Sequence, residues 1–216
     1  KEETAAYWHE QFVNMYHSSL TQVPYLPMET MSRIMDKALQ GEPLTIVLGD
    51  SVDSTTKKQQ ETMFTSLQGT LDVMGLPYKV INNRQILKQK INNELASSNI
   101  IAIGSTRVNG LIQALKPDII PKAKAIGIDW KGVTTSKTAS GAYIIKHPYN
   151  QNRLLLHFFW NEDALNKAAV EQYTAQMVSA LNFSTDFYQY YVMDKTGAIT
   201  ADKKVSNPLA AFFAEE

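Results

Sequence analysis

The chain has 216 residues, 44% of them hydrophobic, and is long enough to bury a substantial core. Lys plus Arg and Asp plus Glu both number 21, and no basic run stands out, which argues against nucleic acid or an anionic membrane surface as a partner. The absence of cysteine excludes disulfides and thiolate metal sites. No apolar run approaches the roughly 20 residues of a membrane-spanning helix.

The cellular compartment is predicted from the first residue of the sequence and from the absence of cysteine. The sequence begins with Lys1 rather than Met. Either it is a processed part of an exported precursor, or this boundary has no biological meaning. We expect an extracellular or cell-envelope location, and a cytoplasmic one stays open because a chain without cysteine fits both.

The N-terminal part is expected to be helical. Apolar residues recur at helical spacing over 4–20 and again over roughly 28–40, and the prolines of VPYLP (23–27) separate the two runs. Gly41 is a suitable residue to follow the second helix. We therefore treat 1–41 as an N-terminal helical extension.

An α/β domain is predicted over 42–181. Short β-branched runs predict strands at 44–49, 77–81, 99–104 and 123–130. Amphipathic segments between them predict helices over 54–74, over about 84–96, and from Asn109 to just before Pro117. Strands that alternate with helices indicate a mostly parallel sheet with helices on both faces.

The pattern changes after residue 140. The runs 142–149 and 153–160 are separated by a short polar loop and predict an antiparallel hairpin at the edge of the sheet. A helix is expected over 162–181, and residues 182–216 are expected to form a final hairpin and tail. The predicted fold is a three-layer α/β/α, flavodoxin-like, mostly parallel sheet with an antiparallel hairpin at its edge. Rings of FYQYYVMD (187–194) are expected in part on an outer face, as a partner contact.

The first and third predicted strands suggest a binding crevice. In a flavodoxin-like strand order, ligands bind where the carboxyl ends of these strands meet, and free N–H groups and small hydroxyls there suit an anion. The alternative is that the same residues only turn the chain and cap helices. The candidate ligand-binding residues are Gly49, Asp50, Ser51, Gly104, Ser105, Thr106 and Asn109.

The run LGDS (48–51) resembles the first block of the GDS-type serine hydrolases. That resemblance implies Ser51 as a nucleophile, which needs an imidazole to remove its proton. The Asp-x-x-His block of that family is missing, because Ile144 and Leu154 stand three positions before His147 and His157. Ser51 is therefore a weak catalytic candidate.

No cofactor is predicted. GVTTSKT (132–138) lacks the spacing of a phosphate-binding loop, and no GxGxxG stretch is present. Asp50, Asp53 and Asp129 lie near predicted strand ends and are the weak candidates for a hard cation, with helix caps and turns as the simpler explanation. No metal site is predicted.

A wider likeness covers roughly 44–160. The turn with Gly104 and Asn109 after a strand, then a Gly-x-Tyr strand and HPYNQNR (147–153), resembles the accessory α/β domain appended to some secreted bacterial peptidases and esterases. That family tends to show a Pro-Asn-Pro-x-x-Arg-Tyr-like hairpin, whose second Pro is replaced here. The likeness implies a non-catalytic domain and transfers no catalytic residue.

Three hypotheses follow. The first is a non-catalytic accessory or recognition domain of an exported protein, part of a larger hydrolase or docked on a protein partner. The second is an esterase that uses Ser51. The third is a domain that binds a small anion at the crevice.

Overall fold

A computed structural model describes most of the predicted α/β domain and the last hairpin. The described residues are 41–50, 54–73, 75–82, 86, 91–105, 107, 109–137, 139–161, 188–196 and 198–204. The predicted helices at 4–20, 28–40 and 162–181 lie outside them, as do the boundary at 181/182 and the tail after 204.

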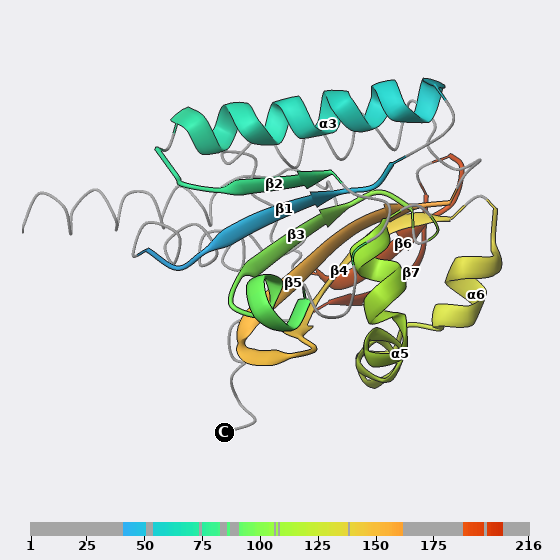
Figure 1. Ribbon diagram of the computed structural model, residues 1–216. Coiled ribbons are helices and arrows are strands. Elements are labelled where there is room, and N and C mark those ends of the chain that lie inside the picture. Colours follow the sequence, from blue (N-terminus) through green and yellow to red (C-terminus); the bar gives the residue numbers. More distant parts are fainter. Residues whose placement is uncertain are drawn as a thin grey trace, which may run out of the picture.

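The described residues form one seven-stranded mixed sheet (Figure 1). Its order is β2-β1-β3-β5-β4-β6-β7; neighbours from β2 to β5 pair in parallel, and all later pairs are antiparallel. The strands are β1 Leu44–Leu48, β2 Lys79–Asn82, β3 Asn99–Ile103, β4 Ser140–His147, β5 Asn150–Trp160, β6 Tyr188–Met193 and β7 Ile199–Lys204.

Helices cover both faces of this sheet, so the α/β/α prediction is confirmed for the described residues (Figure 1). The helix α3 (Ser54–Val73) packs on one face through Met63, Leu67 and Leu71. On the other face lie the π-helical turn η1 (Ile91–Leu95), the helix α5 (Gly110–Ala125) and the short helix α6 (Trp130–Thr135). Every residue of β1 and β3 is buried, as expected of parallel strands between two helical layers.

The fourth predicted strand, 123–130, is wrong, and so is the predicted end of the preceding helix. The helix α5 continues through Pro117 and Pro121 to Ala125. Both prolines are exposed, while Leu111, Ile112, Leu115, Ile119 and Ala123 form a buried stripe on the opposite side. Burying each large apolar residue contributes about 1.5–3 kcal/mol, enough to offset the cost of a proline on the solvent face.

The Ile-Gly-Ile run after α5 ends the helix and is not a strand. Gly127 has φ +103, its N–H donates to the Lys124 carbonyl, and the Ile128 N–H donates to the Ala123 carbonyl. This is the Schellman arrangement, in which a left-handed glycine follows the last helical residues and the next apolar residue packs back. Ile128 is accordingly buried.

The hairpin of β4 and β5 is confirmed, but its predicted place at the edge is wrong. Strand β5 lies between β3 and β4, and Leu154 to Trp160 are all buried. The run is apolar on both faces because it is an interior strand. The final hairpin, β6 with β7, is the edge instead. Tyr191 and Tyr190 are buried in the core clusters on opposite faces of the sheet, so these two rings form no outer face.

Candidate functional site

The carboxyl ends of β1 and β3 lie side by side, as the crevice prediction requires. The Gly49 N–H donates to the Ile103 carbonyl at 2.7 Å, and the Gly104 N–H donates to the Phe158 carbonyl at 3.0 Å. The strands β1, β2, β3 and β5 all end at this edge, which we call the carboxyl edge. The structure thus brings Gly49 and Gly104 together, while Ser51 and Thr106 lie outside the described residues.

Glycine is required at position 104 by both conformation and space. Gly104 has φ +126, and a Cβ there would lie 3.1 Å from the Gly49 Cα and 3.1 Å from Gln60 Oε1. The Gln60 Nε2 donates to the Gly49 carbonyl at 2.6 Å. This buried amide of α3 therefore occupies the space between the two strand ends that an open crevice would offer to a ligand.

Asn109 holds the start of α5 to the ends of β1 and β3. Its Nδ2 donates to the carbonyls of Val47 and Ile103, at 3.0 and 3.2 Å. Its Oδ1 accepts from the Ile112 N–H at 3.2 Å and caps the helix. Because Asn109 is fully buried and its amide atoms are engaged in these bonds, its role in this structure is structural.

His157 lies beneath the Gly104 turn and is not available as a base. Its Nε2 is 2.9 Å from the Gly104 carbonyl and its Nδ1 is 2.9 Å from the Tyr143 hydroxyl. Since a carbonyl only accepts, Nε2 carries the proton, and Nδ1 accepts from Tyr143. Burial lowers the pKa of His157 to about 4, against a smaller opposing effect of the bond to Gly104, and burial raises the pKa of Tyr143. Both side chains are neutral at pH 7.

His147 is at the other end of the sheet. It ends β4, which runs antiparallel to β5, and it pairs with Asn150 at the start of β5. Its Nδ1 accepts from the Tyr149 N–H at 3.0 Å, and burial lowers its pKa to about 4. Among the described residues, neither imidazole is therefore placed to activate a serine that follows β1.

Of the remaining predicted residues, Ser105 has a local role in the turn after β3. Ser105 is buried, and its hydroxyl accepts from the Arg107 N–H at 3.2 Å within the turn after β3. Asp50 is half-buried, and Asp129 is exposed before α6. The described residues contain no cluster of three acidic or imidazole groups that suits a metal ion, and Asp53 lies outside them.

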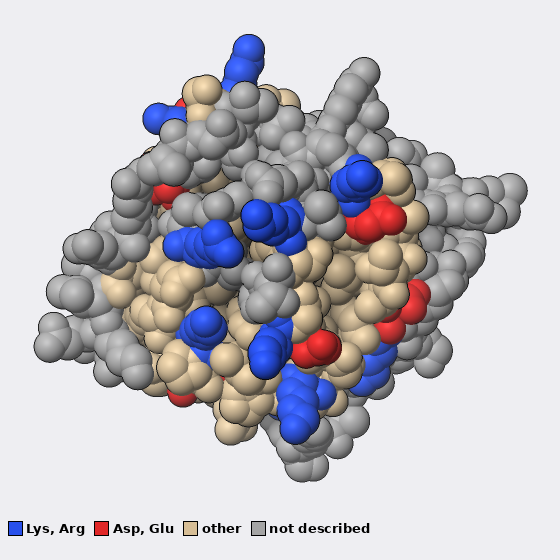
Figure 2. All heavy atoms as spheres, turned by 90° about the vertical axis from the view of Figure 1, so that its right-hand side faces the viewer, with Lys and Arg blue, Asp and Glu red and all other residues tan. Residues whose placement is uncertain are grey.

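Among the described residues at this edge, exposed Lys and Arg side chains outnumber Asp and Glu side chains. Figure 2 views the edge directly and shows Lys and Arg side chains gathered across the face, with fewer Asp and Glu side chains. By position in the fold, the basic residues here are those at the starts of α3 and α6 and on the neighbouring turns. We call them the basic rim: Lys57, Lys58, Arg107, Lys131, Lys137 and Lys195.

Two of these buried polar side chains, Gln60 and Tyr143, were not predicted from the sequence. Gln60 lies in a helix among other polar residues, and no local pattern distinguishes it from an exposed side chain. Tyr143 was expected in a strand, but its contact with His157 depends on β4 pairing with β5 in this register. A signal did exist for His157 itself, because it interrupts an otherwise apolar run and so must find partners inside the core.

Comparison of the chain with protein-family models and with curated proteins finds no match. Within the part of the chain that the structure describes, no helix is long and apolar enough to cross a membrane.

Proposed function

We propose that this chain is a non-catalytic recognition domain, and that its carboxyl edge docks on an acidic surface or segment of a protein partner. One observation carries the proposal. At this edge the buried side chains of Gln60, Asn109 and His157 form hydrogen bonds with backbone carbonyls. The basic rim, in contrast, faces solvent.

The filled space between the strand ends favours a protein partner over a small anion. Gln60 and Asn109 take the positions that a buried anion would need, so the contact is spread over the surface. Exposed charges act over about 10 Å at 0.1 M salt and set the rate and orientation of docking more than its strength. A domain with no net charge overall thus has one face suited to acidic partners.

The test is binding of a fluorescent oligo-glutamate peptide, followed by anisotropy at low and at physiological salt. We expect saturable binding that weakens as salt rises. The double variant Lys57→Glu/Lys58→Glu reverses two charges of the basic rim and should weaken binding at least several-fold. The unlabelled partner, once found, replaces the peptide in the same assay.

The matched control is Lys79→Glu/Lys203→Glu. Lys79 begins β2 and Lys203 lies near the end of β7, so both are at the strand ends opposite the carboxyl edge. The change in net charge is the same as in the first variant. We expect this control to bind nearly as well as the unaltered protein. Equal loss in both variants would mean a general charge effect, and no binding at low salt would contradict the proposal.

The esterase hypothesis is kept as the alternative, because Ser51 comes three residues after the end of β1 in the sequence. It predicts hydrolysis of short acyl esters such as p-nitrophenyl acetate, lost on Ser51→Ala. We expect no hydrolysis above the blank in either protein. Activity that Ser51→Ala abolishes would replace the recognition role with a catalytic one.

A further inference from the structure

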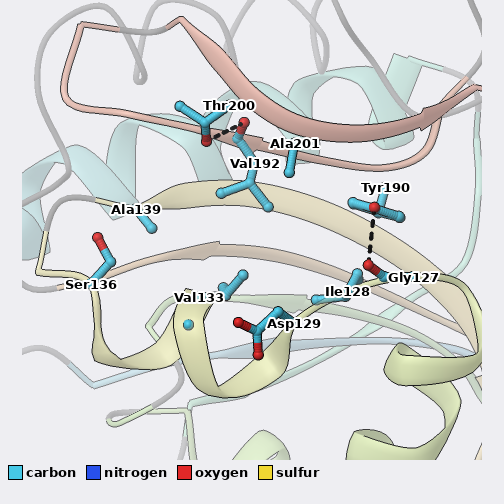
Figure 3. A pocket seen from close by; sticks show the side chains of 11 residues that line it. Gly127, Ile128, Asp129, Val133, Ser136, Ala139, Tyr190, Val192, Thr200 and Ala201 are labelled. Carbon is cyan, nitrogen blue, oxygen red and sulfur yellow. Dashed lines mark hydrogen bonds between the residues drawn. The ribbon is translucent and has the colours of Figure 1, made fainter.

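A second site lies away from the ends of β1 and β3, between the turn after α5, the helix α6 and the hairpin of β6 and β7 (Figure 3). It is a pocket of about 280 Å³, slightly smaller than the pockets that hold drug-sized ligands. Its lining residues are Gly127, Ile128, Asp129, Gly132, Val133, Ser136, Ala139, Tyr190, Val192, Thr200 and Ala201.

The walls of the pocket are mostly apolar. Ile128, Ala139 and Val192 are buried core residues that present their side chains to it. The Tyr190 hydroxyl donates to the Gly127 carbonyl at 3.2 Å, which fixes the ring at one end, as Figure 3 shows. Burial, with a smaller effect of Asp202, raises the pKa of Tyr190 and keeps it a donor.

The lining contains one ionisable carboxylate, that of Asp129. This residue precedes α6 at the N-cap position, yet its side chain makes no capping hydrogen bond. A Cβ on Gly132 would come within 2.4 Å of Asp129 Oδ2, so glycine at 132 leaves the room that the carboxylate occupies. An exposed carboxylate beside an apolar wall offers charge to one end of a ligand and contact area to the other.

We propose that this pocket binds a small organic cation, a primary ammonium carried on an aromatic or branched apolar body. The ammonium would lie against Asp129, and the apolar body between Val133 and the Tyr190 ring. Charge complementarity selects a cation, and the volume limits the body to about one ring. This site differs from the proposed docking surface because it uses an acidic group and a cavity, and the two adjoin, since Lys131 and Lys137 of the basic rim flank Asp129 and Ser136 in the sequence.

The test is an NMR titration of the protein with phenethylammonium chloride. We expect saturable shifts of amide signals around the pocket, such as those of Gly127 and Thr200. The anion 3-phenylpropanoate, of similar size and opposite charge, should give none there. No saturable shift up to tens of millimolar, or equal binding of the anion, would overturn the proposal.

Substitutions test separately how the charge of Asp129 and the space in the cavity contribute to Kd. Asp129→Asn should raise Kd roughly two- to five-fold, the range of an exposed ion pair. Glu61→Gln removes the same charge from the exposed side of α3, on the other face of the sheet, and should leave Kd unchanged. Ala201→Phe fills the pocket from its exposed rim and should abolish binding, with its amide spectrum as the check on folding and Ala201→Leu as a smaller substitute. Equal effects of Asp129→Asn and Glu61→Gln, or full binding by a folded Ala201→Phe or Ala201→Leu protein, would contradict the proposal.

Discussion

Acid should destabilise this protein through His157, and the effect can be isolated. The imidazole is fully buried, donates from Nε2 to the Gly104 carbonyl and accepts at Nδ1 from Tyr143. The variant His157→Gln removes the titration but keeps one donor and one acceptor in roughly these positions. Comparing the two proteins across pH therefore measures the titration of one buried group.

The magnitude follows from the two pKa values. The pKa of His157 is lowered to about 4 in the folded state, whereas an unfolded histidine titrates near 6.5. The unfolded state therefore binds the proton first, and stability falls as pH drops from about 6.5 toward 4. Between pH 7 and pH 5 the loss from this one group is about 2 kcal/mol, at about 1.36 kcal/mol per pH unit.

The assay is urea unfolding at pH 7, 6 and 5 for the unaltered protein and for His157→Gln. We expect the loss of unfolding free energy on acidification to be about 2 kcal/mol smaller in the variant. Nitrogen chemical shifts of the ring give an independent check, since they report a proton on Nε2 at pH 7. The same pH dependence in both proteins would refute a buried, neutral His157.

Three further substitutions test the carboxyl edge by urea unfolding at pH 7. Gly104→Ala should cost about 2–4 kcal/mol, from backbone strain and the contact with Gln60. Gly69→Ala, at an open position in the C-terminal part of α3, should stabilise by about 0.5–1 kcal/mol, and equal effects of the two variants would contradict the close approach at Gly104. Asn109→Ala should cost about 2–4 kcal/mol, and Asn109→Asp at least as much, because a carboxylate would face two carbonyls; a well-tolerated Asp would mean that the amide donors are unimportant. Tyr143→Phe should cost about 1–3 kcal/mol by leaving Nδ1 of His157 without its donor, and no loss would argue against that bond.

Local pattern predicted the parallel part of the fold because the signals there are short-range. The strands at 44–48 and 99–103 are β-branched runs, and the buried stripe of α3 has helical spacing. The failures came where tertiary burial outweighs local propensity. The stripe from Leu111 to Ala123 keeps α5 helical through two prolines, whose local signal ends a helix.

The meeting of the two strand ends could be predicted from the sequence, but the side chains between them could not. Strand order put Gly49 and Gly104 together, as expected from the meeting of parallel strands. What fills the space between them depends on side chains distant in sequence. Gln60 reaches Gly49 from the second turn of α3, and His157 reaches Gly104 from an interior strand whose position was wrongly predicted. Such contacts depend on the packed fold, and no periodic pattern in the sequence indicates them.

The most direct test of the recognition role is to map where an acidic chain touches the protein. In an NMR titration with oligo-glutamate at low salt, we expect saturable amide shifts around Lys57, Arg107 and Lys131, and none near Lys79 or Lys203. Amide shifts spread evenly over the carboxyl edge and the opposite strand ends, or no shifts at all, would contradict the account.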